Sequence, residues 1–336
     1  MEARLEAFAS REITDDQVGK TYGIKNGFDW DMKKARAKYI AQGVVGSSIH
    51  RYHYRPLDDR WICYDNILVS RPLRRVNEHM CHENLGLCIV RQYAYNRPYS
   101  HFLVTDSLSD DRVFVSNRGQ AYLFPLYLYQ NSSGRRSNIR QTFRKVIEPL
   151  YGKISDDESF LFYCYAVFYS QKYRKKYFDL LSKEFPRVPL TSDKSIYKLL
   201  RDFGEKLVRL HTLKTEPSDA RKGTFPIAGS DLVEKIEFDA KNERVYINSK
   251  QYFGRIGSLV WNYYIGGYQV VEKYLKSRSG RRLSGTEMES IQRIVGIINE
   301  TIALEGKIDS LYDKVKKNLF EYEEKPEQSP LFLDEE

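Results

Sequence analysis

The chain has 336 residues, of which 41% are hydrophobic and 14% aromatic, so it can bury a sizeable core and is not a disordered chain. Its 54 lysines and arginines outnumber 45 acidic residues, and the formal charge of +9 permits nucleic acid or another polyanion as a partner without establishing one. Four cysteines without a CxxC pair and no secretory signal predict a reduced, cytoplasmic protein, and no apolar run approaches the roughly 20 residues of a membrane helix.

The first 44 residues are expected to form a linker and a short helix. Residues 1–28 are a polar lead-in, and residues 29–41 have a short helical pattern. The type of basic residue then changes. From Arg51 to Arg144 there are 14 arginines, eight acidic residues and no lysine, a formal charge of +6, whereas lysine outnumbers arginine from Lys145 onward. This lysine-free segment is densest in arginine at 54–75, YRPLDDRWICYDNILVSRPLRR, and the change predicts two regions with different roles.

Residues 45–150 are predicted to be β-rich. Turn formers such as PLDD, NRPYS, SLSDD and SNRGQ separate short apolar or alternating runs, which are WICY, LGLCIV, HFLVT, RVFV and AYLFPLYLY. Trp61 and Tyr64 in the first run are expected to build the core of these strands. Asparagine and glutamine lie among the arginines and tyrosines downstream of this run.

Residues 151–322 are predicted to be mostly helical. The expected helices span 158–182, 192–213, 257–277 and the stretch that follows Ser284 with an apolar stripe from Ile291 to Val315. Ser155 or Asp156 caps the first and Ser192 or Asp193 the second, and the two prolines of FPRVPL end the first. VEKIEFDAKNERVYIN predicts a hairpin with its turn at 241–242, and residues 323–336 form an acidic tail.

The predicted fold class is therefore α+β. A β-rich N-terminal recognition part is expected to pack on a mostly helical C-terminal part that carries a small hairpin and a long final helix. His211, at the end of a predicted helix, is expected to be structural rather than catalytic.

The motifs of several enzyme classes are missing. NRPY at 96–99 resembles the Asn-Pro-Pro-aromatic motif of adenosylmethionine-dependent methyltransferases only superficially, because Arg97 replaces the first proline and no glycine-rich turn precedes it. There is no GxxxxGK[ST] phosphate loop and no Asp and Glu-x-Lys arrangement of a metal-dependent nuclease on an apolar strand. No common zinc spacing is matched by Cys63, His79, Cys81, His82 and Cys88, so buried thiols and surface histidines are favoured.

These absences favour binding over catalysis. The planar fork of arginine matches phosphate oxygens or guanine O6 and N7 bidentately, and asparagine or glutamine can pair with adenine N6 and N7 in the same groove. The lysine-free segment therefore has the composition of a base-reading surface. For any single arginine the alternative stays open that it is solvated or packed on a tyrosine as a structural cation–π pair.

Three long blocks also match patterns of a known family, in the family's order. They are YRPLDDRWICYDNILVSRPLRRVNEHM…ENLGLCIVRQ, YAVFYSQKYRKKYFDLLSKEFPRVPL and QYFGRIGSLVWNYYIGGYQVVEKYLKSRSGRRLSGTEMESIQRIV. Over roughly residues 30–310 the chain resembles the C-terminal specificity region of Type ISP restriction–modification enzymes and their adenine-methyltransferase relatives.

The resemblance implies that this chain is a target-recognition domain, which docks on double-stranded DNA, reads a short asymmetric site and helps to present one adenine. The family's complete enzymes place a nuclease, a translocating ATPase and an N6-adenine methyltransferase before this region. These domains would be the partners of the chain, in cis or as a separate chain. The resemblance further implies that S-adenosylmethionine, ATP and Mg²⁺ belong to those domains, and that this chain holds no cofactor.

Two other classes of function remain as alternatives. The chain would be a structural or interaction subunit if its helical half, with the lysine-rich 171–183 face and the long final helix, docked on a methyltransferase partner. A stand-alone methyltransferase or nuclease would need a motif that the sequence does not contain.

The family blocks themselves are expected to be architecture, since specificity varies between relatives. FPRVPL and IGGYQV belong here, and Gly266-Gly267 is expected to let two backbones approach closely. The loops between blocks are the better candidates for base contacts. The candidate DNA-binding residues are Arg71, Arg74 and Arg75 as a phosphate clamp, and Arg91, Gln92, Asn96, Arg97, Tyr99, His101, Arg112, Asn117, Arg118 and Gln120 as the reading set.

Overall fold

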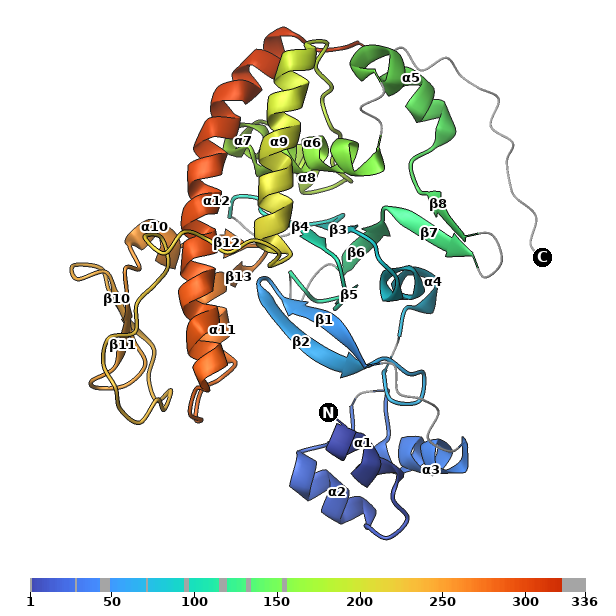
Figure 1. Cartoon of the computed structure of the whole chain (residues 1–336), viewed down its shortest axis with the longest axis vertical. Helices are drawn as coiled ribbons and strands as arrows, with labels where there is room; N and C mark the ends of the chain where they lie inside the picture. Colours follow the sequence, from blue (N-terminus) through green and yellow to red (C-terminus); the bar gives the residue numbers. More distant parts are fainter. Residues whose placement is uncertain are drawn as a thin grey trace.

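The computed structural model describes residues 2–27, 29–42, 49–70, 72–93, 97–114, 120–130, 134–152 and 156–321. Small sheets lie between a group of three N-terminal helices and a larger helical part, along one side of which the long helix α12 runs (Figure 1). This arrangement confirms the predicted α+β class, with the β-rich part against a mostly helical C-terminal part. The described helices are not long and apolar enough for any of them to cross a membrane.

The N-terminal residues form more structure than a polar lead-in. They contain three helices, α1 (Glu2–Ala9), α2 (Asp15–Tyr22) and α3 (Met32–Gln42), of which only the third was predicted. Thr14 and Gln17 form a capping box at the start of α2. The three helices enclose a small core of their own around Phe8, Val18 and Tyr39. Helices of eight residues that bury one or two side chains each leave no apolar stripe in the sequence, which is why the prediction missed them.

Eight strands follow in the described residues. They are β1 (Ile49–Arg55), β2 (Asp58–Cys63), β3 (Gly86–Val90), β4 (Phe102–Thr105), β5 (Leu108–Ser109), β6 (Ala121–Pro125), β7 (Tyr127–Gln130) and β8 (Gly134–Ser137). The hairpin of β1 and β2 receives β5 as a parallel neighbour of β1, while β3 lies between β4 and β6 with both neighbours antiparallel. The strands β7 and β8 pair separately. The short helices α4 (Arg74–Asn77) and η1 (Glu78–Cys81) connect β2 to β3.

Two expectations in this part were wrong. The run RVFV is not a strand over its described residues, because residues 111–114 form turns and bends, and Val115 lies outside the described residues. Trp61 is not a core residue, since it is 64% exposed. Trp61 lies in the middle of β2, where the side chains are less buried than Asp58 and Cys63 at its two ends. Tyr64 is half-buried, and its hydroxyl donates to the backbone oxygen of Pro72 at 2.5 Å.

The helical part contains eight described helices. They are α5 (Gln141–Tyr151), α6 (Asp157–Tyr169), α7 (Gln171–Lys176), α8 (Phe178–Leu181), α9 (Lys194–His211), α10 (Ser258–Trp261), α11 (Val270–Lys276) and α12 (Gly285–Lys317). The predicted caps Asp156, Asp193 and Ser284 each accept a hydrogen bond from the first turn of α6, α9 and α12, respectively. The predicted hairpin is present as β9 (Glu237–Asp239) and β10 (Arg244–Tyr246), and β11 (Tyr252–Gly254) extends it to three strands.

Two predicted long helices are interrupted. The helix expected across 158–182 is divided into α6, α7 and α8, because Ser170 caps α7 through the backbone N–H of Tyr173 and donates to Asp309 of α12 at 2.6 Å. The helix expected across 257–277 is interrupted by a hairpin of β12 (Tyr264–Ile265) and β13 (Tyr268–Gln269). Both interruptions depend on contacts with distant parts of the chain, so the local pattern did not show them.

The turn of this second hairpin makes the close backbone approach that Gly266-Gly267 predicted. Gly266 has φ +61°, and a Cβ there would lie 2.7 Å from Cβ of Phe114. The backbone N–H of Gly266 donates to Ser100 at 2.8 Å, and that of Gly267 donates to Phe114 at 2.8 Å. The glycine pair therefore fastens the segment 97–114 to the helical part.

The main core is centred on α6, which is buried on nearly all sides. Phe102 of β4 stacks on Phe168 of α6 with ring centroids 4.3 Å apart, which joins the sheet to the helices. On its other side, α6 meets α9 so closely that a Cβ at Gly204 would lie 1.8 Å from the backbone oxygen of Phe162. His211, at the end of α9, is fully buried and hydrogen-bonded to Tyr165 and to Thr301.

The Gly204 contact gives a test of the helix packing. Gly204→Ala should lower the free energy of unfolding by about 3 kcal/mol or more, because the methyl group overlaps a backbone atom that cannot move by itself. Gly306→Ala in α12 is the matched control, since no atom lies within 4 Å of its added Cβ. That control should stabilise the protein by up to about 1 kcal/mol through helix propensity. Denaturant unfolding measures both, and equal effects of the two substitutions would contradict the packing.

The buried histidines give a test by pH. Burial lowers the pKa of His101 and of His211 to about 3, whereas an unfolded chain binds the proton near 6.5. The unfolded state therefore holds more protons between these values, and stability should fall as pH drops below 6.5, by up to about 1.4 kcal/mol per pH unit for each histidine. His101→Phe should reduce this slope by about half, because it removes one of the two histidines. Phenylalanine suits the position, since the ring of residue 101 lies among Tyr93, Tyr99 and Phe114. If the free energy of unfolding of the variant fell with pH from 7 to 4.5 as steeply as that of the original protein, the lowered pKa of His101 would be contradicted.

Candidate nucleic-acid interface

Part of the arginine-dense stretch holds the protein together. Asp58 of β2 is buried and accepts hydrogen bonds from Arg278 at 3.0 and 3.2 Å and from Arg60 at 3.0 Å. Arg55 pairs with Asp110 at 3.3 Å, and Arg51 pairs with Asp59 and with Asp106. These contacts fasten the β1–β2 hairpin to β5 and to the end of α11. The PLDDR sequence is therefore architectural.

Two of these arginines also confirm the cation–π alternative. The guanidinium carbons of Arg55 and Arg60 both lie 3.9 Å from the ring centroid of Tyr54. Arg55 additionally lies 5.6 Å from the ring of Tyr268 in β13. Such stacking suits the flat guanidinium better than a lysine ammonium. The absence of lysine here thus has a structural cause.

Other arginines of the lysine-free segment face solvent. These side chains are exposed and have no ion pair among the described residues. The group consists of Arg75, Arg91, Arg97, Arg112, Arg135, Arg136 and Arg140. Arg74 is also exposed and pairs with Glu78 one helical turn away at 3.2 Å. A surface pair of this kind contributes little, about 0–1 kcal/mol, so Arg74 can exchange its partner for a phosphate.

Arg91 and Arg97 each lie beside an aromatic ring, in two separate groups of side chains. We call the set Phe124, Tyr122, Phe185, Arg91, Arg97 and Tyr264 the arginine–aromatic strip. Tyr122 and Phe124 are 42% and 41% exposed on the edge strand β6, and both rings pack edge-on against Phe185 at 5.1 and 5.6 Å. Arg91 lies 5.9 Å from the ring of Phe185.

The far end of the strip is Arg97, whose guanidinium carbon lies 4.7 Å from the ring of Tyr264. Between the two arginines, the backbone N–H of Tyr93 donates to Ser182 at 3.0 Å, and its ring contacts Phe178. The strip therefore consists of two arginine–aromatic groups, one at β6 and Phe185 and the other at the β12–β13 hairpin. Interleaved cations and flat rings can bind phosphates and stack on bases.

The candidate residues divide into three groups. Arg71, Asn96, Asn117 and Arg118 lie outside the described residues. Arg74, Arg75, Arg91, Gln92, Arg97, Arg112 and Gln120 are exposed. The remaining two, Tyr99 and His101, are fully buried and are removed from the set of DNA contacts.

The burial of Tyr99 and His101 has a clear cause. The hydroxyl of Tyr99 donates to the backbone oxygen of Val90 at 2.7 Å, and burial raises the pKa of this phenol. His101 lies between aromatic rings, and neither of its ring nitrogens has a hydrogen-bond partner in the described part of the chain. Because the β12–β13 turn covers residues 100 and 114, this segment turns inward.

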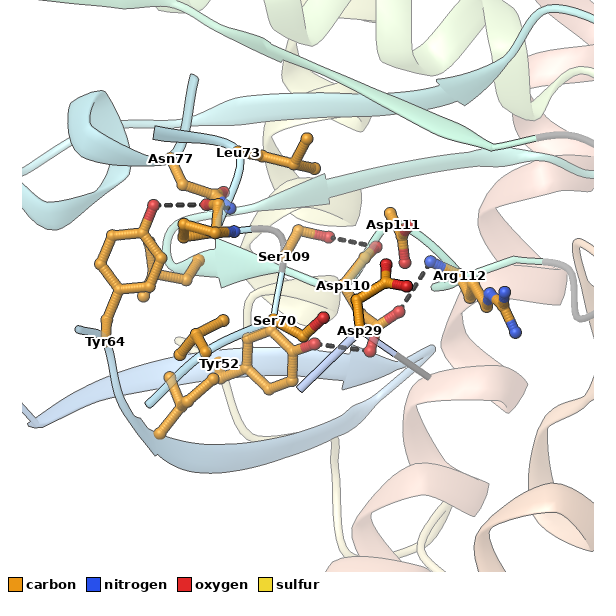
Figure 2. Close-up of a pocket in the computed structure, with 14 residues that line it drawn as sticks. Asp29, Tyr52, Tyr64, Ser70, Leu73, Asn77, Ser109, Asp110, Asp111 and Arg112 are labelled. Atoms are coloured by element: carbon orange, nitrogen blue, oxygen red, sulfur yellow. Dashed lines mark hydrogen bonds between the residues drawn. The ribbon is translucent and has the colours of Figure 1, made fainter. Parts of the chain in front are cut away.

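A cavity of about 480 Å³ lies beside Arg112, between the β1–β2 hairpin, β5 and the loop before α4 (Figure 2). Asp110 accepts hydrogen bonds there from the hydroxyl of Tyr52 at 2.5 Å and from the backbone N–H of Arg112 at 2.7 Å. Asp29 and Asp111 also line it. Figure 2 shows the guanidinium of Arg112 extending away from these carboxylates. An acidic lining repels phosphate, so DNA is not expected to enter this cavity.

The described residues do not form a metal site. Among the described residues, histidine, cysteine and carboxylate side chains do not gather in groups of three or more that could hold a metal ion. Cys63 and Cys88 are buried, and all four cysteines are free thiols.

Several surface residues were missed by the sequence analysis. Tyr122, Phe124, Phe185 and Tyr264 were not among the candidates. The alternation in AYLF places Tyr122 and Phe124 on one face of a strand, which was a usable signal. No local signal marks the exposed Phe185 or the half-buried Tyr264 as a surface residue, because each lies inside a block that was interpreted as architecture.

Comparisons with known proteins give the family. The structure resembles a DNA-bound nuclease-deletion mutant of the Type ISP restriction–modification enzyme LlaGI, with TM-score 0.60, 19% identity, and coverage of 90% of this chain and 25% of that chain. It also resembles DNA-bound LlaBIII, with TM-score 0.62, 18% identity and coverage of 94% and 21%. A DrdV–DNA complex gives TM-score 0.66, 18% identity and coverage of 91% and 32%.

At such identities, these likenesses show a common fold, and this chain spans only a third or less of those chains. A sequence comparison with curated proteins gave no match. The model of the Type ISP C-terminal specificity domain, however, matches residues 1–304. The protein therefore belongs to the Type ISP C-terminal specificity domain family.

Proposed function

We propose that this chain is the target-recognition part of a restriction–modification enzyme and that it binds duplex DNA in a sequence-specific manner. The observation that carries the proposal is the arginine–aromatic strip on a member of a specificity-domain family, because its two arginines are exposed and free of ion pairs among the described residues. The resembling LlaGI, LlaBIII and DrdV structures are complexes with DNA, which supports a duplex as the ligand.

The proposed DNA-binding surface has two parts, one that contacts phosphates and one that contacts bases. Arg74 and Arg75 on α4 act as the phosphate clamp, together with Arg71. Because α4 contacts β6 and η1 contacts β7, the exposed Arg135 and Arg136 of β8 extend the clamp. Phosphate contacts of this kind fix the position on the duplex and carry no sequence information.

The reading set lies on the loops downstream of the clamp. Its exposed members are Arg91, Gln92, Arg97, Arg112 and Gln120, and Asn96, Asn117 and Arg118 belong to the same loops. Stacking of Arg97 on Tyr264, and the looser contact of Arg91 with Phe185, restrain the guanidinium groups while leaving their N–H edges free for guanine O6 and N7.

Catalysis belongs outside this chain in our proposal. Methyl transfer, ATP-driven translocation and cleavage, with S-adenosylmethionine, ATP and Mg²⁺, are assigned to methyltransferase, helicase and nuclease domains in cis or on a separate chain. The coverage of 21–32% of the resembling chains leaves room for such domains. The four free cysteines fit a reduced, cytoplasmic protein.

The alternative of a docking subunit has less support. Its proposed lysine-rich face at 171–183 is partly occupied within the chain, because Lys172 pairs with Asp313 and Arg174 pairs with Glu305 of α12. Of the two, Arg174 is largely buried with Glu305 and is not free for a partner protein, whereas Lys172 is exposed and would have to give up Asp313.

Selection from a random duplex library tests the proposal. The chain, alone and with a methyltransferase partner, should enrich one asymmetric motif. Binding to that motif should weaken with salt, since each phosphate contact adds about 0.9 to the slope of log affinity against log salt. If no motif were enriched under either condition, but the chain bound the methyltransferase, the docking subunit would be favoured instead.

Single substitutions separate reading from clamping. Arg91→Ala or Arg97→Ala should cost about 1–3 kcal/mol on the selected motif and much less on unrelated duplexes, because a bidentate base contact is lost. Arg75→Ala should weaken all duplexes alike and reduce the salt slope by about one contact. Fluorescence anisotropy over a salt series measures both quantities. Equal losses on all duplexes for Arg91→Ala and Arg97→Ala would make these residues clamps.

A further inference from the structure

A second cavity opens beneath the Arg97 end of the strip. It has a volume of about 1010 Å³ and lies between the segment 97–100, α7, the start of α8 and the β12–β13 hairpin. This volume is at the upper end of the range of about 300–1,000 Å³ that is usual for small-ligand pockets. The cavity is separate from the acidic one beside Arg112, with which it shares no lining residue.

The mouth of this cavity is cationic. Arg97 and Lys175 both line it, are exposed, and have no ion pair with any carboxylate of the described residues. The two come from different elements, a loop and a helix, and both line one opening. An opening with two uncompensated positive charges favours an anionic ligand.

The floor is neutral and fixed. Glu305 of α12 is only 2% exposed, and its carboxylate accepts hydrogen bonds from Arg174 at 2.6 Å, Gln171 at 2.9 Å and Tyr263 at 3.0 Å. Burial, and then the charge of Glu305, hold the pKa of Tyr263 well above its usual value, so this phenol remains a donor. The charge of Glu305 is balanced by Arg174 and does not repel an anion at the mouth.

The walls are aromatic. Phe178 and Tyr264 are half-buried and line the cavity, together with Tyr263 and the backbone of Gly266. Tyr264 carries Arg97 on its ring, so a cation and a flat apolar face lie next to each other. A ligand that satisfies both needs a planar aromatic group with a phosphate attached nearby.

We propose that this cavity binds one unpaired nucleotide, with its phosphate at Arg97 and Lys175 and its base against Phe178 and Tyr264. The nucleotide is either part of an unstacked DNA strand or a free mononucleotide, since both present the same chemistry. The first source rests on the proposed function, because the strand would reach the cavity along the arginine–aromatic strip. The second source does not depend on it.

Calorimetric titration of the whole chain tests the site. The probes are deoxyadenosine monophosphate, adenosine, inorganic phosphate and a short single-stranded oligonucleotide, with an intact duplex measured alongside. The monophosphate or the single strand should bind more tightly than adenosine or phosphate, because only they supply both parts of the contact. Tighter binding of the strand than of the monophosphate identifies a strand as the source, and the reverse identifies the free nucleotide.

Substitutions locate the binding. Tyr264→Ala should weaken binding of the preferred probe by about tenfold, since a base loses one stacking face, and Lys175→Ala should weaken it by about tenfold, since the phosphate loses one positive charge. Tyr252→Ala and Arg209→Ala, which remove the same kinds of group far from the cavity, should have no effect. Because Lys175 is exposed, its substitution preserves the fold and stands in if Tyr264→Ala unfolds.

Each result decides the question. No binding of the monophosphate and the single strand, or equal binding of inorganic phosphate, overturns the site even if the duplex binds. Binding of the preferred probe that neither substitution weakens also overturns it. If the chain bound the monophosphate but did not bind the duplex, the nucleotide site would be supported and the proposed function would be refuted.

Discussion

The buried ion pair between Asp58 and Arg278 is the constraint on which the arrangement of the two halves depends. Asp58 is on the second strand of the lysine-free part, and Arg278 follows α11, 220 residues later. The guanidinium of Arg278 nevertheless donates two hydrogen bonds to the carboxylate of Asp58. Both side chains are nearly inaccessible, at 4% and 7% exposure. Removing one partner of such a pair leaves an uncompensated buried charge, which usually costs about 3–5 kcal/mol. The hairpin is thus held in one position on the helical part.

The same arginine transmits that position to the long helix. Arg278 donates to Glu287 at 2.9 Å, and Glu287 completes the capping box of α12 with Ser284. Hydrogen bonding from Arg281, followed by the backbone N–H of Ser284 and by Arg278, lowers the pKa of Glu287 to about 2, so it stays charged. From this cap, α12 runs about 50 Å at 1.5 Å per residue and holds Ser170 and Arg174 near its other end. One helix therefore aligns both the hairpin and the floor of the larger cavity.

Sequence reasoning succeeded where the signal was local. Asp193 and Ser284 start their helices as expected, because a cap needs only its own first turn. The interruption at Ser170 was not predictable, since it depends on Asp309, which lies 139 residues away. For the candidate site, the exposed arginines of the downstream loops were found from composition. The burial of Tyr99 and His101 was not, because it follows from the β12–β13 turn that covers their segment.

Arginine has two uses in the lysine-free segment, and the structure separates them. In the densest stretch, Arg55 and Arg60 stack on Tyr54 and pair with carboxylates, so their charge is already compensated. In the downstream loops, Arg97 also stacks on a ring and Arg91 lies near one, but no carboxylate of the described residues pairs with them. Stacking restrains the guanidinium and reduces the entropy lost when it binds, while its charge stays available. Since the same packing preference serves both uses, the density of arginine does not separate them, and the missing acidic partner distinguishes the arginines whose charge stays available.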